Sequence, residues 1–367
     1  MIIQATSAVV AGRMVGQTWV EVSENLIRSV NSGVNPLSDQ SIDGVLIPGF
    51  VDIHCHGGGG KYFSALTPGE IHSVIETHRG HGTTSLFASL VSESLETLKE
   101  QIQQLKPFVT SGQITGIHLE GPYLSHAKCG AHDPLLLINP EVSDIKEILE
   151  VAQGAISMIT IAPELPGSIE AITYLSAAGV TVALGHTDGG FKDATAGTKA
   201  GATIVTHFMN AMNKNITPDS FASFVMADER LSIELILDGH HVTFAAAKEI
   251  YAAVGARLIF ITDAMAAAGA TDGKYTIGNL PVNVKDGVAR LDSNGALAGS
   301  TLTMERVFLN AINELGLSII EAVAATSTRA AERMGLSDRG EIAVGNRADL
   351  LSYHAGQKTI TLINSHG

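Results

Sequence analysis

Short apolar runs alternate along this chain with longer segments whose apolar residues recur at helical spacing. This alternation predicts repeated βαβ units and a parallel sheet. Eight strand-helix units over about 250–300 residues favour a closed (β/α)₈ TIM barrel over an open doubly wound sheet. The expected strands are 45–53, 84–89, 114–119, 157–161, 180–184, 203–206, 233–237 and 258–261, and helical patterns between them include 67–81, 92–105, 145–153 and 244–254.

The two ends of the chain follow a different pattern. Residues 18–22 alternate between polar and apolar side chains, and residues 340–344 and 360–363 also have the composition of strands. We therefore expect the N- and C-terminal segments to pair into a small β-sandwich domain. The predicted organisation is a first part of this domain at 1–44, a hydrolase barrel at 45–335 and a second part at 336–367.

Composition narrows the class of protein. Hydrophobic residues make up 45% of the 367 positions and charged residues 16%, so a large core is expected without disulfides. The net charge of −14 and the lack of a dense Lys/Arg run argue against nucleic acid or an anionic membrane as a partner. Cys55 and Cys129 cannot form a disulfide framework. With no signal-like start and no long apolar span, we expect a cytoplasmic protein.

The most informative motif closes the first apolar run. His54 and His56 are spaced i, i+2, so on a strand both imidazoles point to the same face. Glycines 57–60 follow at once and allow a sharp turn beside a substrate. Two histidines in this arrangement can converge on one metal ion at the end of the strand.

Other predicted strands also close on metal-binding residue types. The third ends with Glu120, the fifth with His186, the sixth with His207 and the eighth with Asp263. Function in a (β/α)₈ barrel lies at the carboxyl ends of the strands, so these side chains should gather on one rim. A single histidine at a strand end is more often structural, and an aspartate there also suits a helix cap. The full set favours a metal site.

This set of ligands indicates a reaction class. Imidazoles and carboxylates suit zinc, with iron or another first-row divalent ion as the alternative. One bridging carboxylate with five further ligands can hold two ions about 3.5–4 Å apart, and such ions lower the pKa of water towards 7. A nearby carboxylate, for which Asp263 is the candidate, can take the proton of the water and return it to a leaving amine. We expect hydrolysis of an amide or related C–N bond.

The ordered motifs resemble the amidohydrolase superfamily and, within it, the N-acetylglucosamine-6-phosphate deacetylases. The resemblance spans essentially the whole chain. HxH alone marks only the superfamily, whereas the later motifs are more specific. They are PGFVDIHCHG at 48–57, HLEGPYL at 118–124, GAHDP at 130–134, GHTDG at 185–189, THFMNAMN at 206–213, DGHHV at 238–242, TDAMAAAG at 262–269 and LAGSTLTM at 297–304.

The resemblance implies roles for the residues at the rim. Glu120, His186 and His207 would bind the principal metal, with Glu120 in the place where many relatives carry a carboxylated lysine. Asp263 would be the catalytic base and acid. Because the HxH pair is intact, the chain resembles the two-metal members, with one or two ions expected per subunit. The implied ligand set is His54, His56, Glu120, His186, His207 and Asp263.

The resemblance also implies a substrate and an assembly. The reaction would convert N-acetylglucosamine 6-phosphate to glucosamine 6-phosphate and acetate. It would serve amino-sugar catabolism and cell-wall recycling, and the enzyme would be a homodimer. Cys129 would lie on a loop similar to an active-site flap. The implied substrate contacts are Ala131, His132, Asn210, Ala211, His241, Leu297, Ala298 and Gly299.

One departure from the family pattern keeps alternatives open. The family commonly carries an arginine after the Asn-Ala-Met motif, but here Lys214 follows, which is a point charge without the bidentate fork. A deacetylase of a galactosamine-type or non-phosphorylated amino sugar is therefore an alternative. Dihydroorotase-like, hydantoinase-like or D-amino-acid deacylase activity is less favoured because those enzymes usually use a modified lysine. A non-catalytic relative should have lost ligands, and none is missing here.

Overall fold

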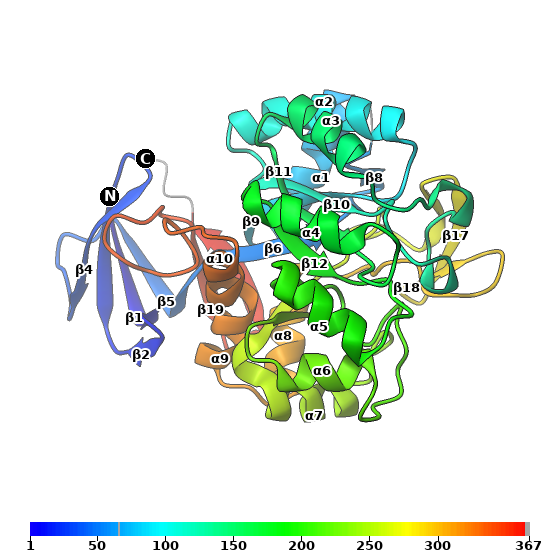
Figure 1. Cartoon of the computed structure of the whole chain (residues 1–367). Helices are drawn as coiled ribbons and strands as arrows, with labels where there is room; N and C mark the ends of the chain where they lie inside the picture. The colour runs from blue at the N-terminus through cyan, green and yellow to red at the C-terminus, as the bar shows by residue number, and fades with distance from the viewer. Residues whose placement is uncertain (65–66, 364–367) are drawn as a thin grey trace. The chain divides into compact units, whose positions relative to one another are not determined.

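The computed structural model describes residues 1–64 and 67–363, and its centre is a parallel barrel (Figure 1). Within these residues eight parallel strands pair in the order β15-β14-β13-β12-β11-β10-β9-β6. The backbone N–H of Asp263 donates to the carbonyl oxygen of His54 at 2.9 Å, which joins the two ends of this order. The predicted (β/α)₈ fold is confirmed. The strands are β6 (Phe50–Cys55), β9 (Thr83–Leu90), β10 (Gly116–Glu120), β11 (Ile156–Ile161), β12 (Thr181–Leu184), β13 (Ile204–Val205), β14 (Ser232–Ile236) and β15 (Leu258–Ile261).

Helices connect successive barrel strands and bury one apolar face each. In α2 the buried side chains include Leu98, Ile102 and Leu105, which recur at helical spacing. The Ser94 side chain accepts the backbone N–H of Thr97 and so caps the start of this helix. The connecting helices are α1 (Pro68–Gly80), α2 (Leu95–Thr110), α3 (Val142–Ala152), α4 (Ser168–Ala177), α5 (Phe191–Ala200), α6 (Phe221–Ala227) and α7 (Phe244–Val254).

The chain ends form a second sheet. Its strands pair in the order β20-β19-β5-β1-β3-β4, with β2 added beside β1, and Leu350 lies opposite Pro48 where the two ends meet. The expected pairing of the two ends is confirmed. The strands are β1 (Ile2–Val10), β2 (Arg13–Val15), β3 (Thr18–Ser23), β4 (Leu26–Ser32), β5 (Gln40–Pro48), β19 (Leu350–His354) and β20 (Thr359–Ile363).

Two strand predictions were wrong, one at the start of the barrel segment and one in the C-terminal part of the small domain. The run 45–53 contains parts of two strands in two sheets, because the chain breaks at Gly49 between β5 and β6. A Cβ at Gly49 would lie 2.1 Å from Oγ1 of Thr84, so only glycine fits this close passage. Residues 340–344 form no strand, since Gly340 and Gly345 have φ of 82° and 91° and bend the chain. Ile342 between them is still buried in the core of the terminal sheet.

A three-stranded antiparallel sheet follows the last barrel strand and was missed from the sequence. It comprises β16 (Gly273–Ile277), β17 (Leu280–Lys285) and β18 (Val288–Leu291). In β17 the buried Val282 and Val284 alternate with exposed residues, which is the period of a half-buried strand. This sheet matters for function because its Ile277 lines the pocket described below.

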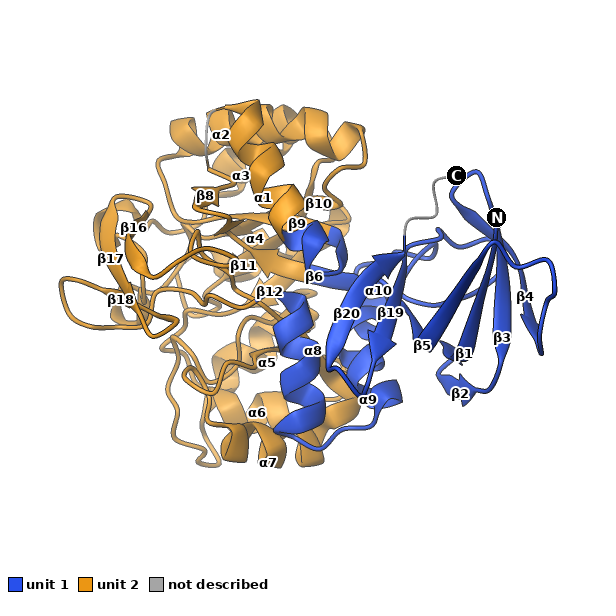
Figure 2. Cartoon of the chain, turned by 180° about the vertical axis from the view of Figure 1, so that it is seen from behind, with its two compact units in different colours: residues 1–52, 78–85, 303–367 blue, residues 53–77, 86–302 orange. Residues whose placement is uncertain are grey.

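The chain divides into two compact units (Figure 2). Unit 1 comprises Met1–Asp52, His78–Ser85 and Thr303–Gly367, and unit 2 comprises Ile53–Thr77 and Leu86–Leu302. Unit 1 also holds α8 (Met304–Asn313), α9 (Ile319–Val323) and α10 (Arg329–Arg333). No helix within the described residues is long and apolar enough to cross a membrane.

Candidate metal centre and substrate pocket

His54 and His56 lie together at the end of β6, as the i, i+2 spacing predicts. Their Nε2 atoms are 3.1 Å apart and both side chains are buried. Cys55 between them is fully buried, and its Sγ lies 3.6 Å from the carbonyl oxygen of Gly57.

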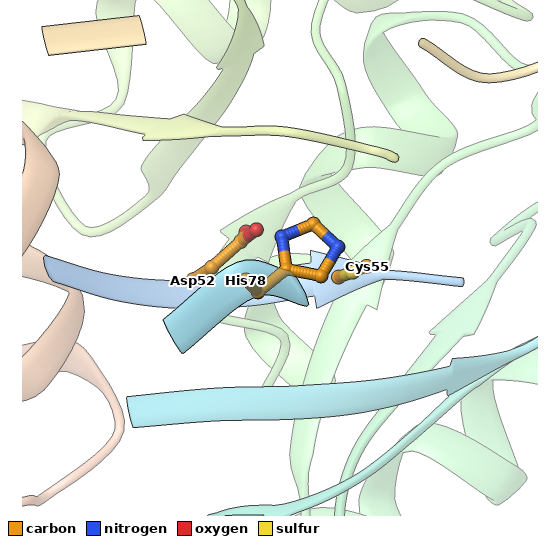
Figure 3. Close-up of side chains that lie close together, drawn as sticks. All are labelled: Asp52, Cys55 and His78. Carbon is orange, nitrogen blue, oxygen red and sulfur yellow. The ribbon is translucent and has the colours of Figure 1, made fainter. Parts of the chain in front are cut away.

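A buried carboxylate and imidazole also lie together in unit 1. Figure 3 shows the side chains of Asp52 and His78 side by side.

Glu120, the last residue of β10, lies close to all four candidate histidine ligands. Its Oε1 lies 2.9 Å from Nε2 of His207 and 3.2 Å from Nε2 of His186. Its Oε2 lies 3.2 Å from Nε2 of His56, and His54 reaches Oε1 at 3.5 Å. The carboxylate is therefore shared by two ligand groups, His54–His56–Glu120 and Glu120–His186–His207.

These distances fit metal coordination. Two ligand atoms about 2.0–2.1 Å from one tetrahedral zinc ion lie about 3.3 Å apart. The Nε2 atoms of His186 and His207 are 3.0 Å apart, and the carboxylate and imidazole separations around Glu120 fall in the same range. Five buried imidazole and carboxylate groups with their ligand atoms turned inward form a donor set suited to a divalent ion.

Asp263 borders the first ligand group. Its Oδ1 lies 3.3 Å from Nε2 of His56 and 3.6 Å from Nε2 of His54. Asp263, His186 and His207 each follow a barrel strand by two residues, and they have φ of 47°, 48° and 27°. Non-glycine residues seldom adopt this left-handed region, and such strain concentrates at functional sites. It turns the three side chains inward over the strand ends.

The buried charges shift one another's pKa values. Burial opposes ionisation of Glu120, but the charge of His54 and hydrogen bonds from other imidazoles hold the pKa of this carboxyl well below its usual range. Burial likewise opposes ionisation of Asp263, whose pKa the two HxH histidines lower. Burial alone would lower the pKa of His54, yet the surrounding carboxylates raise it well above its ordinary value. Both carboxylates are thus held as anions, the form that binds a cation.

The loop after β10 contacts the second ligand group. The Nδ1–H of His186 donates to the carbonyl oxygen of Lys128 at 2.8 Å, which leaves Nε2 free to face Glu120. Cys129 follows directly and is half-buried, with its Sγ 4.0 Å from the carbonyl oxygen of Gly130. The predicted flap segment is therefore tied to a candidate ligand through its backbone.

A pocket of about 230 Å³ opens over these groups. Ala298 is not among its lining residues: its N–H pairs with the carbonyl of Ala289, and its methyl group packs in an apolar core. Sequence reasoning missed Gly130, Ile277 and Ala296, of which Ile277 ends β16 of the undetected antiparallel sheet and Ala296 follows β18. The predicted substrate residues that do line the pocket are Ala131, His132, Asn210, Ala211, His241, Leu297 and Gly299, together with Lys214.

Two pocket histidines are held by hydrogen bonds from behind. The Nδ1 of His241 lies 2.7 Å from Oδ2 of Asp238. Burial alone would raise the pKa of the Asp238 carboxyl, but its hydrogen bond and charge interaction with His241 hold that pKa below its usual value. The Nδ1 of His132 accepts the backbone N–H of Ser92, so its Nε2 carries the proton when the ring is neutral. Burial lowers the pKa of His132 to about 4. The Nε2 of His132 lies 3.3 Å from Oε2 of Glu120, and both rings line the pocket.

The chain is similar in sequence and in structure to known proteins. The Amidohydrolase family matches residues 45–362. A solved structure of N-acetyl-D-glucosamine-6-phosphate deacetylase from Mycobacterium smegmatis, an aspartate-to-alanine mutant in complex with N-acetyl-D-glucosamine-6-phosphate, is 38% identical with a TM-score of 0.96, and the match covers 100% of this chain and 98% of that one. N-acetylgalactosamine-6-phosphate deacetylase of Escherichia coli O157:H7 is 31% identical, covering 85% of this chain and 84% of that protein. N-acetylglucosamine-6-phosphate deacetylase of Bacillus subtilis (strain 168) is 31% identical, covering 96% and 92%.

Proposed function

The chain belongs to the amidohydrolase family, and from that membership we propose that it hydrolyses the N-acetyl amide of N-acetylglucosamine 6-phosphate to glucosamine 6-phosphate and acetate. It is a metal-dependent hydrolase, as its family is. The observation that carries the substrate class is the joint likeness to deacetylases of amino-sugar 6-phosphates over nearly the whole chain. The geometry that supports the reaction is Glu120 surrounded by imidazoles with Asp263 at the base of the pocket.

The donor set suits zinc, with iron or another first-row ion as the alternative. The principal ion would be held by Glu120, His186 and His207. A second ion would be held by His54, His56 and Asp263. Such ions supply Lewis acidity, which polarises an acetyl carbonyl and lowers the pKa of water. The Asp263 carboxylate would accept the proton of the attacking water and return it to the amine nitrogen as the C–N bond breaks. His132 and His241 would donate hydrogen bonds to the sugar or its acetyl oxygen.

Two ions per subunit are expected in the wild-type enzyme, and His54→Ala should retain only one. Removing His54 deletes a ligand of the His54–His56–Glu120 group and leaves Glu120, His186 and His207 intact. Elemental analysis of the purified protein measures the ratio. His72→Ala is the matched control, since His72 is exposed on α1. A wild-type ratio of one that does not change in His54→Ala would contradict the two-metal proposal.

We propose that Lys214 binds the 6-phosphate, because it is the lysine that lines the pocket. Lys214→Ala should lower kcat/KM for N-acetylglucosamine 6-phosphate by about 10- to 100-fold, the range of a charge-assisted hydrogen bond, and leave hydrolysis of N-acetylglucosamine unchanged. Lys248→Ala, exposed on α7, is the control. Equal kcat/KM for the two sugars in the wild-type enzyme would remove the phosphate requirement.

The likeness to galactosamine-type deacetylases supports a second candidate substrate, N-acetylgalactosamine 6-phosphate. The two sugars differ in the configuration of one hydroxyl, so a direct comparison of kcat/KM for the two phosphates decides between them. We further propose a homodimer, which sedimentation velocity would detect as a species of twice 38.3 kDa. The proposed setting is cytoplasmic amino-sugar catabolism and cell-wall recycling, and cell fractionation tests the location.

A further inference from the structure

We propose that Glu234 is a positioning residue, which holds His54 in the one tautomer that can bind the second metal ion. This inference rests on the two-metal form of the proposed function. Glu234 lies in the middle of β14 and is fully buried. It does not line the substrate pocket, so any part it has in the reaction must pass through another residue.

The two ring nitrogens of His54 lie beside different carboxylates. Nδ1 lies 3.1 Å from Oε2 of Glu234, whereas Nε2 lies 3.5 Å from Oε1 of Glu120 and 3.6 Å from Oδ1 of Asp263. An ionised carboxylate only accepts hydrogen bonds, so Nδ1 must carry the proton that it donates to Glu234. In the neutral ring, the form that binds a metal ion, the lone pair is then on Nε2, which faces the ligand group. A carboxylate behind a histidine ligand also makes the ligand nitrogen more basic.

The burial of Glu234 is costly enough to need an explanation. A carboxylate without water is expensive unless it is paired, and its Oε1 has no hydrogen-bond partner within the described part of the chain. Its Oε2 accepts the backbone N–H of His207 at 3.3 Å, a weak contact that a neutral side chain could equally supply. What a neutral side chain could not supply is an acceptor-only partner for His54.

The other three proposed histidine ligands of the metal site differ from His54 in this respect. His186 donates its Nδ1–H to a backbone carbonyl, that of Lys128. The Nδ1 atoms of His56 and His207 have no hydrogen-bond partner among the described residues. Among the described residues, His54 is therefore the only one of these four histidines whose Nδ1 faces a carboxylate, and loss of Glu234 should weaken the His54–His56–Glu120 group and spare Glu120–His186–His207.

Glu234→Gln keeps the shape of the side chain but adds an N–H₂ group that can face Nδ1 and favour the wrong tautomer. Partners of this kind are worth about 10- to 100-fold in metal affinity. We expect the variant to bind the second zinc ion about 10- to 100-fold more weakly, with the first ion unaffected. Titration with zinc from a chelator buffer, followed by elemental analysis, measures both affinities without reference to activity. Excess zinc should restore kcat, which it would not do if the variant were misfolded.

Matched variants separate the outcomes. Glu234→Leu, which cannot accept at all, should weaken the second ion at least as much as Glu234→Gln, and Glu249→Gln on the exposed face of α7 should change nothing. Two ions bound with wild-type affinity in Glu234→Gln, alongside one ion in His54→Ala, would overturn the positioning role and leave the proposed function standing. Loss of both ions from Glu234→Gln would overturn it as well, because the effect would then be a general structural one. A single ion in the wild-type enzyme would remove its premise.

Discussion

Asp263→Asn is expected to lower kcat for release of acetate by about 10²- to 10⁴-fold, the contribution usual for a general acid–base group. The asparagine side chain has the same shape but cannot take a proton from water or return one to the amine nitrogen. In the wild-type protein the HxH histidines hold the pKa of Asp263 low despite burial, so the carboxylate is ready to accept a proton. The principal ion should stay, because its proposed ligands are Glu120, His186 and His207 and do not include Asp263.

Steady-state kinetics on N-acetylglucosamine 6-phosphate, with elemental analysis of the same preparation, tests this expectation. Asp286→Asn is a suitable control, because Asp286 is exposed and its φ of 54° also suits asparagine. A drop in kcat with one or more ions still bound would support the assigned role. A variant with kcat within tenfold of the wild-type value would assign the proton transfers to another group, and His132 and His241 are candidates that also line the pocket.

The site could be predicted from the sequence because its geometry follows from rules that are local or fixed by topology. The i, i+2 spacing placed His54 and His56 on one face, and the parallel order of the strands placed Glu120, His186 and His207 on the same rim. Neither inference required a distance. The reason for the split of residues 45–53 at Gly49 lies outside the local sequence, because it is the approach of Thr84 from a distant segment that excludes a side chain there.

The parts that sequence reasoning missed depend on contacts between segments far apart in the chain. Glu234 reads as one polar residue in an apolar strand, and its meaning comes only from His54, 180 positions earlier. Ile277 in β16 and Ala296 after β18 line the pocket, so this sheet contributes to it from a segment that follows the last barrel strand. Alternation in β17 was a usable signal for this sheet. No signal in the chain indicated that His186, His207 and Asp263 would share a left-handed backbone.

Glu120→Gln is expected to remove both ions. Because the general acid–base group acts on water that the metal activates, deacetylation should fall by more than about 10³-fold. Glu120 is common to the two ligand groups, so its loss cannot be confined to one of them. The amide would keep one acceptor oxygen but would turn N–H₂ towards at least one imidazole that is now 2.9–3.3 Å away. It would also remove the negative charge that offsets a divalent cation.

Elemental analysis after exposure to excess zinc measures the loss, with Glu100→Gln on the exposed face of α2 as the control. A cooperative thermal transition would show that the variant is folded, so that empty sites are not a result of unfolding. Retention of two ions would contradict the bridging role. If one ion is retained, the double variant Glu120→Gln/His54→Ala decides which ligand group holds it. An ion that stays bound in the double variant belongs to His186 and His207, and the Glu120 carboxylate then matters chiefly for binding at His54 and His56. The single and double variants together therefore locate the charge that holds the principal ion.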